Sequence, residues 1–398
     1  MTKLKENIFS IGVLNPDIRM SDIIIPCPYG TTYNAYLVKG SEKTALIDTV
    51  HEGFEESYFK DINEIVGIDK VDYLIVNHSE PDHTGIIEKL IEKNPNIEIY
   101  CTSASNIFVK QITNNQNIKF HVIKEGETLS LGDKTLEFHP APFLHWPDSM
   151  FTLVKEDKVL FTCDFLGCHY CENEIIDTKL TSYENYLKSM RSYFVFIFGP
   201  FKPHVLNGLS IIKKLAPDTI CPSHGPILTT EKTIAAAMDN YDKWAQETDV
   251  DLTDIVPIFY VSAYGYTESI AQTLYEEMKV LGKKPVLVNL TEYDRFEINP
   301  VALLNGCKEI CIGSPTINRN ALQPVIDLLK WIDVINSANK KFLIFGSFGW
   351  SGEATGIIQK YLTGMGLNVC QELLKFQFKP TKENLEKVKK VAVEFFGK

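Results

Sequence analysis

The stretch "NHSEPDHTG", from Asn77 to Gly85, places four metal-binding side chains directly after an apolar run. The run itself, "VDYLIV", is typical of a buried β-strand. The loop that leaves it carries the candidate ligands His78, Glu80, Asp82 and His83. Loops at strand ends are where α/β folds tend to place functional side chains. By itself the stretch has two interpretations. It is either a metal site or a polar turn whose carboxylates cap the next helix, which is expected to begin at Gly85.

Three residues further along the chain favour the metal site. His145 lies in "FLHWPDSM", Asp164 in "VLFTCDFLG" and His224 in "ICPSHGP", each after an apolar, strand-like run. Burying such a side chain at the end of a strand is costly unless it finds a partner. The series H-x-E-x-D-H, His, Asp, His therefore predicts that these side chains meet at one site.

The chain is expected to form two domains, because the pattern of apolar runs changes after the polar stretch "AQETDVDLTD" (245–254). Before it, strands rich in Val, Ile, Tyr, Phe and Thr interleave with helical patterns, which predicts a strand-rich α/β domain with more than one sheet. After it, continuous apolar runs alternate with helix-length segments, which is typical of a parallel sheet covered on both faces. We predict domains at residues 1–249 and 250–398, the second a flavodoxin-like doubly wound sheet.

The second domain offers a phosphate-binding loop after its first strand. The segment "IFYVSAYGYTESIAQTLYEEM" (258–278) indicates strand, loop and helix, with the helix beginning near Glu268. Hydroxyl groups, a flexible glycine and a helix N-terminus together suit a phosphate. The loop has neither the P-loop nor the dinucleotide pattern, so a monophosphate such as that of FMN fits, with a plain helix cap as the alternative. Its residues are Ser262, Ala263, Tyr264, Gly265, Tyr266 and Thr267.

Two further loops follow the strands "EICI" and "KFLIF", which lie beside the phosphate loop in a flavodoxin-like sheet. Thr316, Asn318 and Ser347 are expected to hydrogen-bond the flavin ring and ribityl chain. Trp350 is expected to stack on the ring, with a core or interface role as the alternative. The complete set of predicted flavin contacts on these loops is Ser314, Pro315, Thr316, Ile317, Asn318, Ser347, Phe348, Gly349, Trp350, Ser351 and Gly352.

The composition excludes several classes of protein. The net charge is −11 without a basic stripe, which argues against binding to nucleic acid or to an anionic membrane surface. The N-terminus lacks the apolar region of a signal peptide, and no continuous apolar stretch of about 18 residues predicts a membrane span. Nine cysteines, an odd number, fit reduced thiols in a cytoplasm. Cys168 and Cys171 form a single CxxC, which we interpret as structural because no second pair completes a zinc site.

The order and spacing of the candidate ligands resemble the metallo-β-lactamase fold, with one departure. Zinc hydrolases of that fold usually carry HxHxDH, whereas Glu80 stands at the second position here. A carboxylate in place of an imidazole moves the preference from zinc towards iron or manganese. With Glu80, the ligand spacings and the flavodoxin-like domain, the whole chain is similar to the flavodiiron proteins (A-type flavoproteins) without a fused rubredoxin domain. This resemblance implies an N-terminal αββα sandwich followed by a C-terminal flavodoxin-like parallel sheet.

The resemblance also implies two non-haem irons, held by two sets of three ligands with Asp164 as the bridge. The sets are His78, Glu80 and His145 for one iron and Asp82, His83 and His224 for the other. Three carboxylates and a bridging hydroxide would carry about four negative charges, which balances two ferrous ions in a buried site.

Residues around the ligands receive their roles mainly from the resemblance. His169 is expected to line the substrate pocket, and Tyr193 to contribute a hydroxyl group there. Asp48 either orients a ligand histidine through its other ring nitrogen or is simply a turn residue. The remaining histidines lack the pattern and are expected to be structural; they are His51, His121, His139 and His204.

The activity implied by the resemblance is reduction of dioxygen to water, of nitric oxide to nitrous oxide, or of both, as protection against oxidative or nitrosative stress. Electrons would come through FMN from a separate donor, either a rubredoxin with its reductase or a reduced deazaflavin. A head-to-tail homodimer, or a dimer of dimers, would bring each FMN to the irons of its partner. The alternatives are a metallo-β-lactamase-fold hydrolase with an electron-carrier flavodoxin domain, and a non-catalytic electron carrier or redox sensor.

Overall fold

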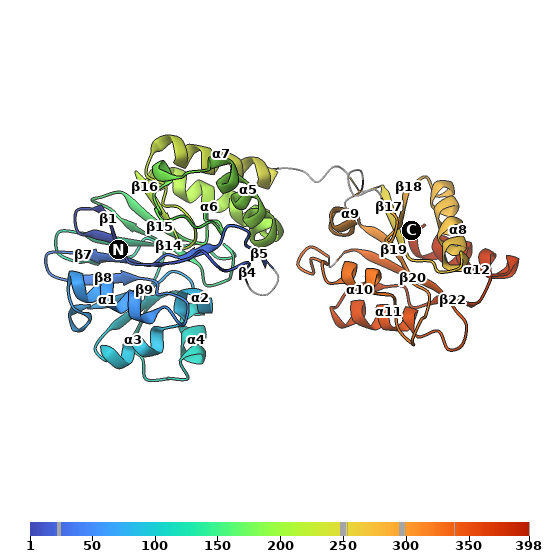
Figure 1. Ribbon diagram of the computed structural model, residues 1–398, viewed down its shortest axis with the longest axis horizontal. Coiled ribbons are helices and arrows are strands. Elements are labelled where there is room, and N and C mark those ends of the chain that lie inside the picture. Colours follow the sequence, from blue (N-terminus) through green and yellow to red (C-terminus); the bar gives the residue numbers. More distant parts are fainter. Residues whose placement is uncertain are drawn as a thin grey trace. The chain divides into compact units, whose positions relative to one another are not determined.

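The chain divides into two compact units, Met1–Glu247 and Thr248–Lys398, each with its own sheets and helices (Figure 1). The predicted boundary between residues 249 and 250 lies outside the residues that the structure describes. The computed structural model describes residues 1–21, 25–246, 252, 254–293, 298, 300–337 and 339–397 of the 398-residue chain.

Two sheets form the centre of the first unit. The strands of the first sheet, in the order in which they pair, are β1 (Thr2–Lys5), β2 (Ile8–Ser10), β7 (Tyr36–Lys39), β8 (Thr44–Ile47), β9 (Tyr73–Val76), β10 (Glu98–Cys101) and β11 (Phe120–Val122). The second contains β12 (Thr128–Ser130), β13 (Thr135–Pro140), β14 (Met150–Val154), β15 (Val159–Cys163) and β16 (Thr219–Pro222). In each sheet the early strands pair antiparallel and the strands nearest the candidate ligands pair parallel, namely β8 with β9 and β15 with β16.

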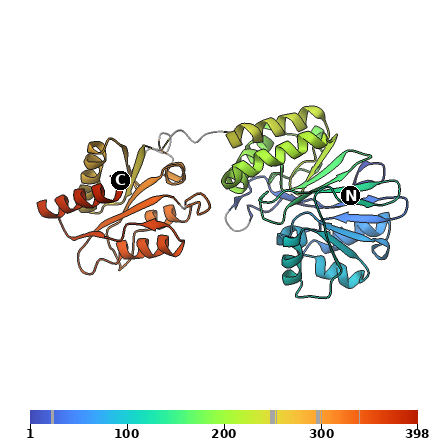
Figure 2. The same ribbon diagram turned by 180° about the vertical axis from the view of Figure 1, so that it is seen from behind.

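Helices cover the outer face of each sheet, so the predicted αββα sandwich is confirmed (Figures 1 and 2). Side chains of both sheets fill the space between them, as Tyr36 of β7 and Phe161 of β15 illustrate with ring centroids 4.9 Å apart. Every residue of β14 and β15 is buried, because helices cover the face that the other sheet does not. The helices are α1 (Glu55–Ile65), α3 (Ile87–Lys93) and α4 (Ser103–Ile112) on the first sheet, and α5 (Tyr183–Tyr193), α6 (Lys202–Leu215) and α7 (Glu231–Gln246) on the second.

One continuous helical stretch, Tyr183–Leu215, is long and apolar enough to cross a membrane by length and composition alone. It joins α5 and α6 through a π-helical turn, η3 (Phe194–Phe198), and the short 3₁₀ turn η4 (Gly199–Phe201). Its apolar residues, among them Met190 and Leu209, pack into the core between the second sheet and α7. This stretch is therefore a core element of the first unit.

The remaining short elements of the first unit connect these layers. Four of the strands form two small antiparallel pairs, and a one-turn helix follows β9. They are β3 (Val13–Asn15) with β6 (Thr31–Tyr33), β4 (Met20–Ser21) with β5 (Ile25–Pro26), the helix α2 (Pro81–Thr84), and the 3₁₀ turns η1 (Ile68–Lys70) and η2 (Asp177–Lys179).

A one-turn helix precedes the predicted one. The helix expected from Gly85 is α3, which begins at Ile87, whereas α2 begins before it at Pro81 because proline suits the first position of a helix, where no backbone N–H is needed. Asp82 and His83 consequently lie in a helical turn, whereas His78 and Glu80 precede it. His145 also departs from the prediction, since it lies in an irregular loop well beyond the end of β13 rather than at the exit of a strand.

The second unit is a parallel sheet with helices on both faces, as predicted. Its strand order reverses beside β17, which is the switch point where flavodoxin-like folds bind FMN. The strands are β18 (Lys284–Asn289), β17 (Ile255–Tyr260), β19 (Glu309–Gly313) and β20 (Lys341–Phe348), with β21 (Asn368–Val369) and β22 (Leu374–Gln377) both paired to β20. Helices α8 (Tyr266–Val280) and α12 (Lys382–Phe396) cover one face, and α9 (Pro300–Gly306), α10 (Gln323–Leu329) and α11 (Ala354–Gly364) the other.

Two glycines of the second unit give opposite predictions for stability. A Cβ atom on Gly346, in β20, would lie 2.2 Å from the carbonyl oxygen of Ser314, whereas one on Gly356, in α11, would meet nothing within 4 Å. We expect Gly346→Ala to destabilise the unit by roughly 1–3 kcal/mol through overpacking. Gly356→Ala should stabilise it by about 1 kcal/mol through helix propensity. Denaturant unfolding of the two variants measures both effects, and equal shifts of the same sign would contradict this account.

Candidate metal centre and flavin loops

All seven predicted ligands offer side-chain atoms in two groups. Within each group the ligand atoms lie within 4.8 Å of one another. The first group contains His78, Glu80, His145 and Asp164, and the second contains Asp82, His83 and His224. The structure thus brings all seven residues together, in the two sets that the resemblance implied.

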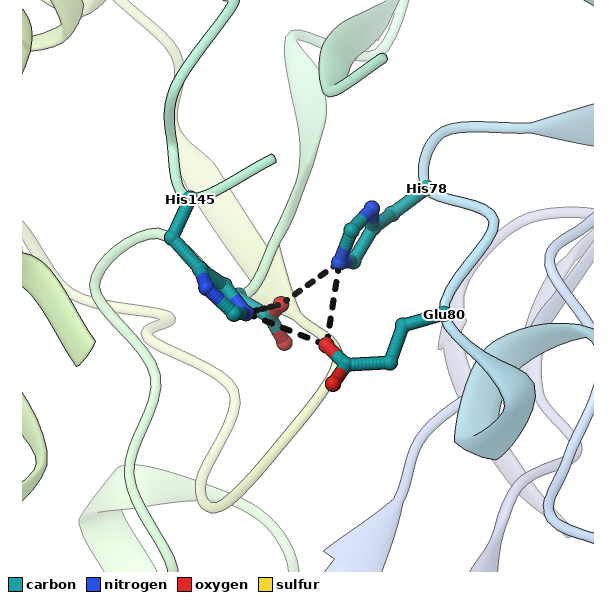
Figure 3. Close-up of side chains that lie close together, drawn as sticks. His78, Glu80 and His145 are labelled. Atoms are coloured by element: carbon teal, nitrogen blue, oxygen red, sulfur yellow. Dashed lines mark hydrogen bonds and ion pairs between the residues drawn. The ribbon is translucent and has the colours of Figure 1, made fainter. Parts of the chain in front are cut away.

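The first set converges on one carboxylate oxygen (Figure 3). Glu80 Oε2 lies 3.1 Å from His78 Nε2 and 3.0 Å from His145 Nε2. His78 and Glu80 come from the loop after β9, and His145 comes from the loop after β13, so both sheets contribute to this set. The Trp146 ring packs edge-on against the His78 ring at a centroid distance of 5.1 Å and limits its movement.

The second set has the same form around Asp82. Its Oδ2 lies 3.1 Å from His224 Nε2, and its Oδ1 lies 3.3 Å from His83 Nε2. Asp82 and His83 come from α2, and His224 comes from the loop after β16. This set too is therefore assembled across the two sheets.

Asp164, at the end of β15, presents one oxygen to each set. Oδ2 lies 3.5 Å from both His78 Nε2 and His145 Nε2. Oδ1 lies 3.2 Å from His83 Nε2 and 3.4 Å from His224 Nε2. A carboxylate that splits its two oxygens between two sets of ligands has the geometry of a bridge between two metal ions.

Partners outside the cluster fix the orientation of two ligand rings. His224 Nδ1 donates to the carbonyl oxygen of Thr32 at 2.6 Å, which leaves Nε2 free to bind a metal. His78 Nδ1 lies 3.3 Å from both carboxylate oxygens of Asp148. Asp148 also accepts from the backbone N–H of Ser79 at 2.7 Å and from its hydroxyl at 2.6 Å. Asp148 was missed by the sequence analysis, although it lies three residues after His145 in the quoted "FLHWPDSM".

Asp48 holds backbone rather than a ligand ring. Its Oδ1 accepts the N–H of Asn77 at 2.7 Å, and its own backbone has a left-handed φ of 55°. Burial raises the pKa of Asp48 to about 7, against the lowering effect of His83. The structure does not show Asp48 orienting a ring nitrogen. Its carboxylate instead anchors the start of the His78 loop. Asn34 does the same for the His224 loop, donating to the carbonyl oxygens of Pro222 and Gly225, both at 2.9 Å.

The donor set fits a pair of metal ions, because several of its buried atoms lack hydrogen-bond partners. Among the residues that the structure describes, no hydrogen bond reaches Asp82 Oδ1, His83 Nε2 or either carboxylate oxygen of Asp164. Leaving such atoms unsatisfied would cost about 1–3 kcal/mol each, and more if charged. Cations placed between the histidine nitrogens and the carboxylates would satisfy all of them at once.

Without a metal, the histidines and carboxylates stabilise each other's charged forms. Burial lowers the pKa of His83, but the charges of Asp82 and Asp164 outweigh burial and raise it to about 10. Burial likewise opposes a charge on His78, and its hydrogen bonds to Asp148 and Glu80 raise its pKa well above the ordinary 6.5. Conversely, burial raises the pKa of Asp164, but His83 and its neighbours hold it well below its usual range. A metal that binds here must therefore displace protons.

The predicted pocket residues lie beside the second set. The His169 ring lies 5.0 Å from the His224 ring and 4.8 Å from the Tyr193 ring. Burial, helped by the charge of His224, lowers the pKa of His169 to about 3, so that its ring is neutral. His169 and Tyr193 also line a cavity of about 240 Å³, together with Ile25, Pro26, Pro28, Tyr29, Lys188, Ser189 and Ser192.

The other histidines and the CxxC lie outside the cluster. His121 and His139 pair with Glu127 and Glu125 at the edge of the sandwich, while His51 and His204 pack on aromatic rings. Cys168 is buried and Cys171 is half-buried, and both thiols are free. Burial raises the pKa of both thiols, which makes them weak nucleophiles.

Hydrogen bonds join the three predicted flavin loops of the second unit. Thr267 Oγ1 lies 2.8 Å from Ser347 Oγ, and the N–H of Thr316 donates to the carbonyl oxygen of Ser347 at 2.9 Å. Ser262 Oγ accepts the N–H of Glu268 at 3.2 Å. The hydroxyls of Thr267 and Ser347 thus hold the loops together, at the C-terminal ends of β17, β19 and β20.

The phosphate loop ends at Gly265, and α8 begins at Tyr266, two residues before the predicted start. Gly265 has a left-handed φ of 78° and offers no side chain to the helix, while Ser262 Oγ accepts the N–H of Glu268 in its first turn. The positive end of the helix suits an anion. Tyr264 is 83% exposed and Trp350 is 95% exposed. The alternative interpretation of Trp350 as a core residue is therefore wrong, and its ring is free to cover a ligand.

The remaining predicted contacts lie on the same three loops. Asn318 lies in a turn between Ile317 and Asn320, with a left-handed φ of 51°. Thr316 Oγ1 accepts the N–H of Ala354, so this hydroxyl braces the loop from within. The other positions on these loops are Ala263, Tyr266, Ser314, Pro315, Phe348, Gly349, Ser351 and Gly352.

Two family models match the chain, one on each unit. A model described as ODP family beta lactamase matches residues 31–225, and a model described as flavodoxin matches residues 258–390. These matches agree with the two architectures described above.

Similar proteins match this chain over almost its whole length. The chain is 44% identical over 396 residues to flavo-diiron protein FprA2 of Clostridium acetobutylicum, covering 99% of this chain and 98% of the relative. It is 32% identical over 372 residues to a nitric oxide reductase of Moorella thermoacetica, covering 93% and 91% of the two chains. The solved rubredoxin oxygen:oxidoreductase of Desulfovibrio gigas superposes with a TM-score of 0.70 at 31% identity, covering 99% of this chain and 97% of the other.

The contact of Asp148 with His78 predicts a role in metal affinity. We expect Asp148→Asn to weaken the binding of ferrous iron roughly 10- to 100-fold, because outer partners of ligand histidines typically contribute that much. Competition with a chelator of known affinity measures the effect. Asp72→Asn is the matched control, since Asp72 pairs with Lys43 on the surface. Equal affinities of the two variants would contradict the role of Asp148.

The charges in the metal-free cluster predict a pH dependence. The pKa values of His78 and His83 lie above the ordinary 6.5, so their contribution to the free energy of unfolding is fully present below that pH. The contribution is lost as the pH rises towards about 10, the pKa of His83. Urea unfolding of the metal-free protein should therefore show decreasing stability across this window, and His83→Asn should flatten the decrease. The affinity for ferrous iron should increase with pH instead, and a flat stability profile in the unsubstituted protein would contradict the argument.

Proposed function

The chain belongs to the flavodiiron proteins, a family of oxidoreductases, and we propose that it reduces dioxygen to water, nitric oxide to nitrous oxide, or both. The observation that carries the proposal is the position of Asp164. One of its carboxylate oxygens lies beside the histidines of the first set, and the other lies beside the histidines of the second set. A dinuclear zinc hydrolase could use the same bridge, and the residue that favours a redox-active metal pair over that alternative is Glu80, a carboxylate where the hydrolases carry a histidine. The names of the relatives from Moorella and Desulfovibrio support both gases as substrates.

We assign one iron to His78, Glu80 and His145, a second to Asp82, His83 and His224, and the bridge to Asp164. Three carboxylates among seven ligands favour iron over zinc, and Glu80 is the residue that departs from the hydrolase pattern. When bound, two ferrous ions and a reduced flavin would supply four electrons, which is the number consumed when one dioxygen becomes two waters. The protein itself orients the ligand rings through Asp148 and Thr32 and keeps bulk water away by burial.

We assign the FMN phosphate to Ser262–Thr267 and the N-terminus of α8, whose positive end suits an anion. The flavin ring would lie between the exposed side chains of Tyr264 and Trp350 and the loops that contain Thr316 and Asn318. Thr267 and Ser347 would act as a fixed platform because their hydroxyls already bind each other.

The supply of electrons completes the proposal. A separate rubredoxin with its reductase, or a reduced deazaflavin, would reduce the FMN, in a cytoplasmic setting that suits nine free thiols. Head-to-tail pairing of two chains, alone or as a dimer of dimers, would bring each FMN to the irons of the other chain. His169 and Tyr193 would face the substrate, as a neutral imidazole and a protonated phenol.

The test combines composition and reactivity. We expect about two irons and one FMN in each chain, and rapid reoxidation of the fully reduced protein by dioxygen or by nitric oxide in stopped-flow mixing. The faster gas identifies the preferred substrate. Zinc in place of iron, or a reduced protein inert to both gases, would overturn the proposal in favour of a hydrolase or an electron carrier.

A matched variant separates the two redox interpretations. Asp164→Ala should retain FMN and its reduction by the donor, because the flavin loops are built on a different unit. It should lose at least roughly 100-fold in the rate of gas reduction, since the two metal subsites lose their shared ligand. Unchanged reoxidation in this variant would mean that the flavin alone reacts with the gas.

A further inference from the structure

One hydroxyl group lies between a proposed metal ligand and the pocket histidine. Thr31 Oγ1 is 2.9 Å from His169 Nδ1 and 3.5 Å from His224 Nδ1. Thr31 lies on β6 and is fully buried. No role for this residue follows from the ligand pattern, yet it contacts both rings.

The direction of the hydrogen bond follows from the neighbouring distances. His224 Nδ1 donates to the carbonyl oxygen of Thr32 at 2.6 Å, so its hydrogen is already engaged. The Thr31 hydroxyl then has two acceptors within reach, His169 Nδ1 at 2.9 Å and the Thr32 carbonyl at 3.4 Å. A hydrogen bond weakens with distance, so of these two acceptors the Thr31 hydroxyl favours the nearer one, His169 Nδ1.

This direction decides the tautomer of His169. A neutral imidazole has one N–H and one acceptor nitrogen, so accepting at Nδ1 places the hydrogen on Nε2. Among the described residues, His169 Nε2 is buried without a hydrogen-bond partner. Its ring packs against Tyr193 and the metal-side His224, and it lines the 240 Å³ cavity. Within the part of the chain that the structure describes, Ser189 Oγ, on the same cavity, is also buried without a hydrogen-bond partner.

We propose that Thr31 is a positioning residue that holds His169 as the Nε2–H tautomer, so that this buried N–H is offered to an oxygen atom beside the metal pair. The acceptor is a water, a hydroxide or an oxygen atom of the gas. In the other tautomer Nε2 would carry a lone pair in place of the hydrogen and could not donate to that oxygen. The identity of the acceptor rests on the proposed function, whereas the tautomer does not.

The direct test is nitrogen NMR of full-length protein labelled with ¹⁵N-histidine and loaded with zinc, which is diamagnetic. The signal that disappears in His169→Gln identifies the ring, and one-bond coupling shows which nitrogen carries the hydrogen. We expect the Nε2–H form in the unsubstituted protein and in Thr31→Ser. In Thr31→Val the ratio of the tautomers should shift roughly 2- to 10-fold towards Nδ1–H, the worth of one hydrogen bond. An Nδ1–H form in the unsubstituted protein, or no shift in Thr31→Val, overturns the proposal.

A kinetic measurement tests the consequence for the reaction. In the iron-loaded protein, Thr31→Val should lower kcat for gas reduction roughly 2- to 10-fold with unchanged iron content, and Thr31→Ser should restore it. Thr113→Val, which removes a buried hydroxyl at the end of α4, is the control for non-specific effects and should leave kcat unchanged. Equal losses in Thr31→Val and Thr113→Val would overturn the role of Thr31. If the unsubstituted protein binds no iron, the proposed function fails, but the NMR result still decides the tautomer.

Discussion

The rest of the first unit depends on the need to hold three carboxylates and four histidines together in a buried space. Neutralisation decides whether such a cluster can exist, because an unpaired buried charge costs several kcal/mol. Without a metal the histidines take up protons, as the raised pKa values of His78 and His83 indicate. With metal ions the cations replace the protons. The surrounding structure is consistent with both the protonated and the metal-bound state. Asp148 and Thr32 contact the Nδ1 atoms of His78 and His224, which leaves their Nε2 atoms for a metal, and Asn34 binds only the backbone of the His224 loop.

The fold and the seven ligands could be predicted from the sequence, because each follows from a local pattern. Apolar runs of strand length identify the sheets, and ligand-type side chains at their ends identify the site. Glu80 was informative about the metal, because one carboxylate in place of a histidine changes which metal the site prefers. The parallel sheet of the second unit, covered on both faces, also followed from the alternation of apolar runs and helix-length segments.

Contacts between distant segments could not be predicted in this way. Asp148 looks like an ordinary loop residue in the sequence, and only the fold brings it to His78. Asp48 looked equally suited to that role, but its carboxylate meets the backbone of Asn77 instead. Thr31 is not part of any ligand pattern in the sequence. Its position between two histidines arises because β6 pairs with β3 and because the loop after β16 brings His224 close to it. The short helix α2 was not predicted and the start of α8 was misplaced, because proline and glycine act at single positions that a periodic pattern does not resolve.

The assembly of each metal set from both sheets has a consequence for biosynthesis. The ribosome releases His78 and Glu80 long before His145, and His224 emerges last of the seven. The first set is complete in the nascent chain only after Asp164 has been synthesised, and the second only after His224. Metal ions at the sites proposed above would be captured in their final geometry only once both sheets have docked. Under that proposal a folded scaffold would choose the metal, rather than an unfolded chain in which soft or abundant ions such as zinc would compete more freely.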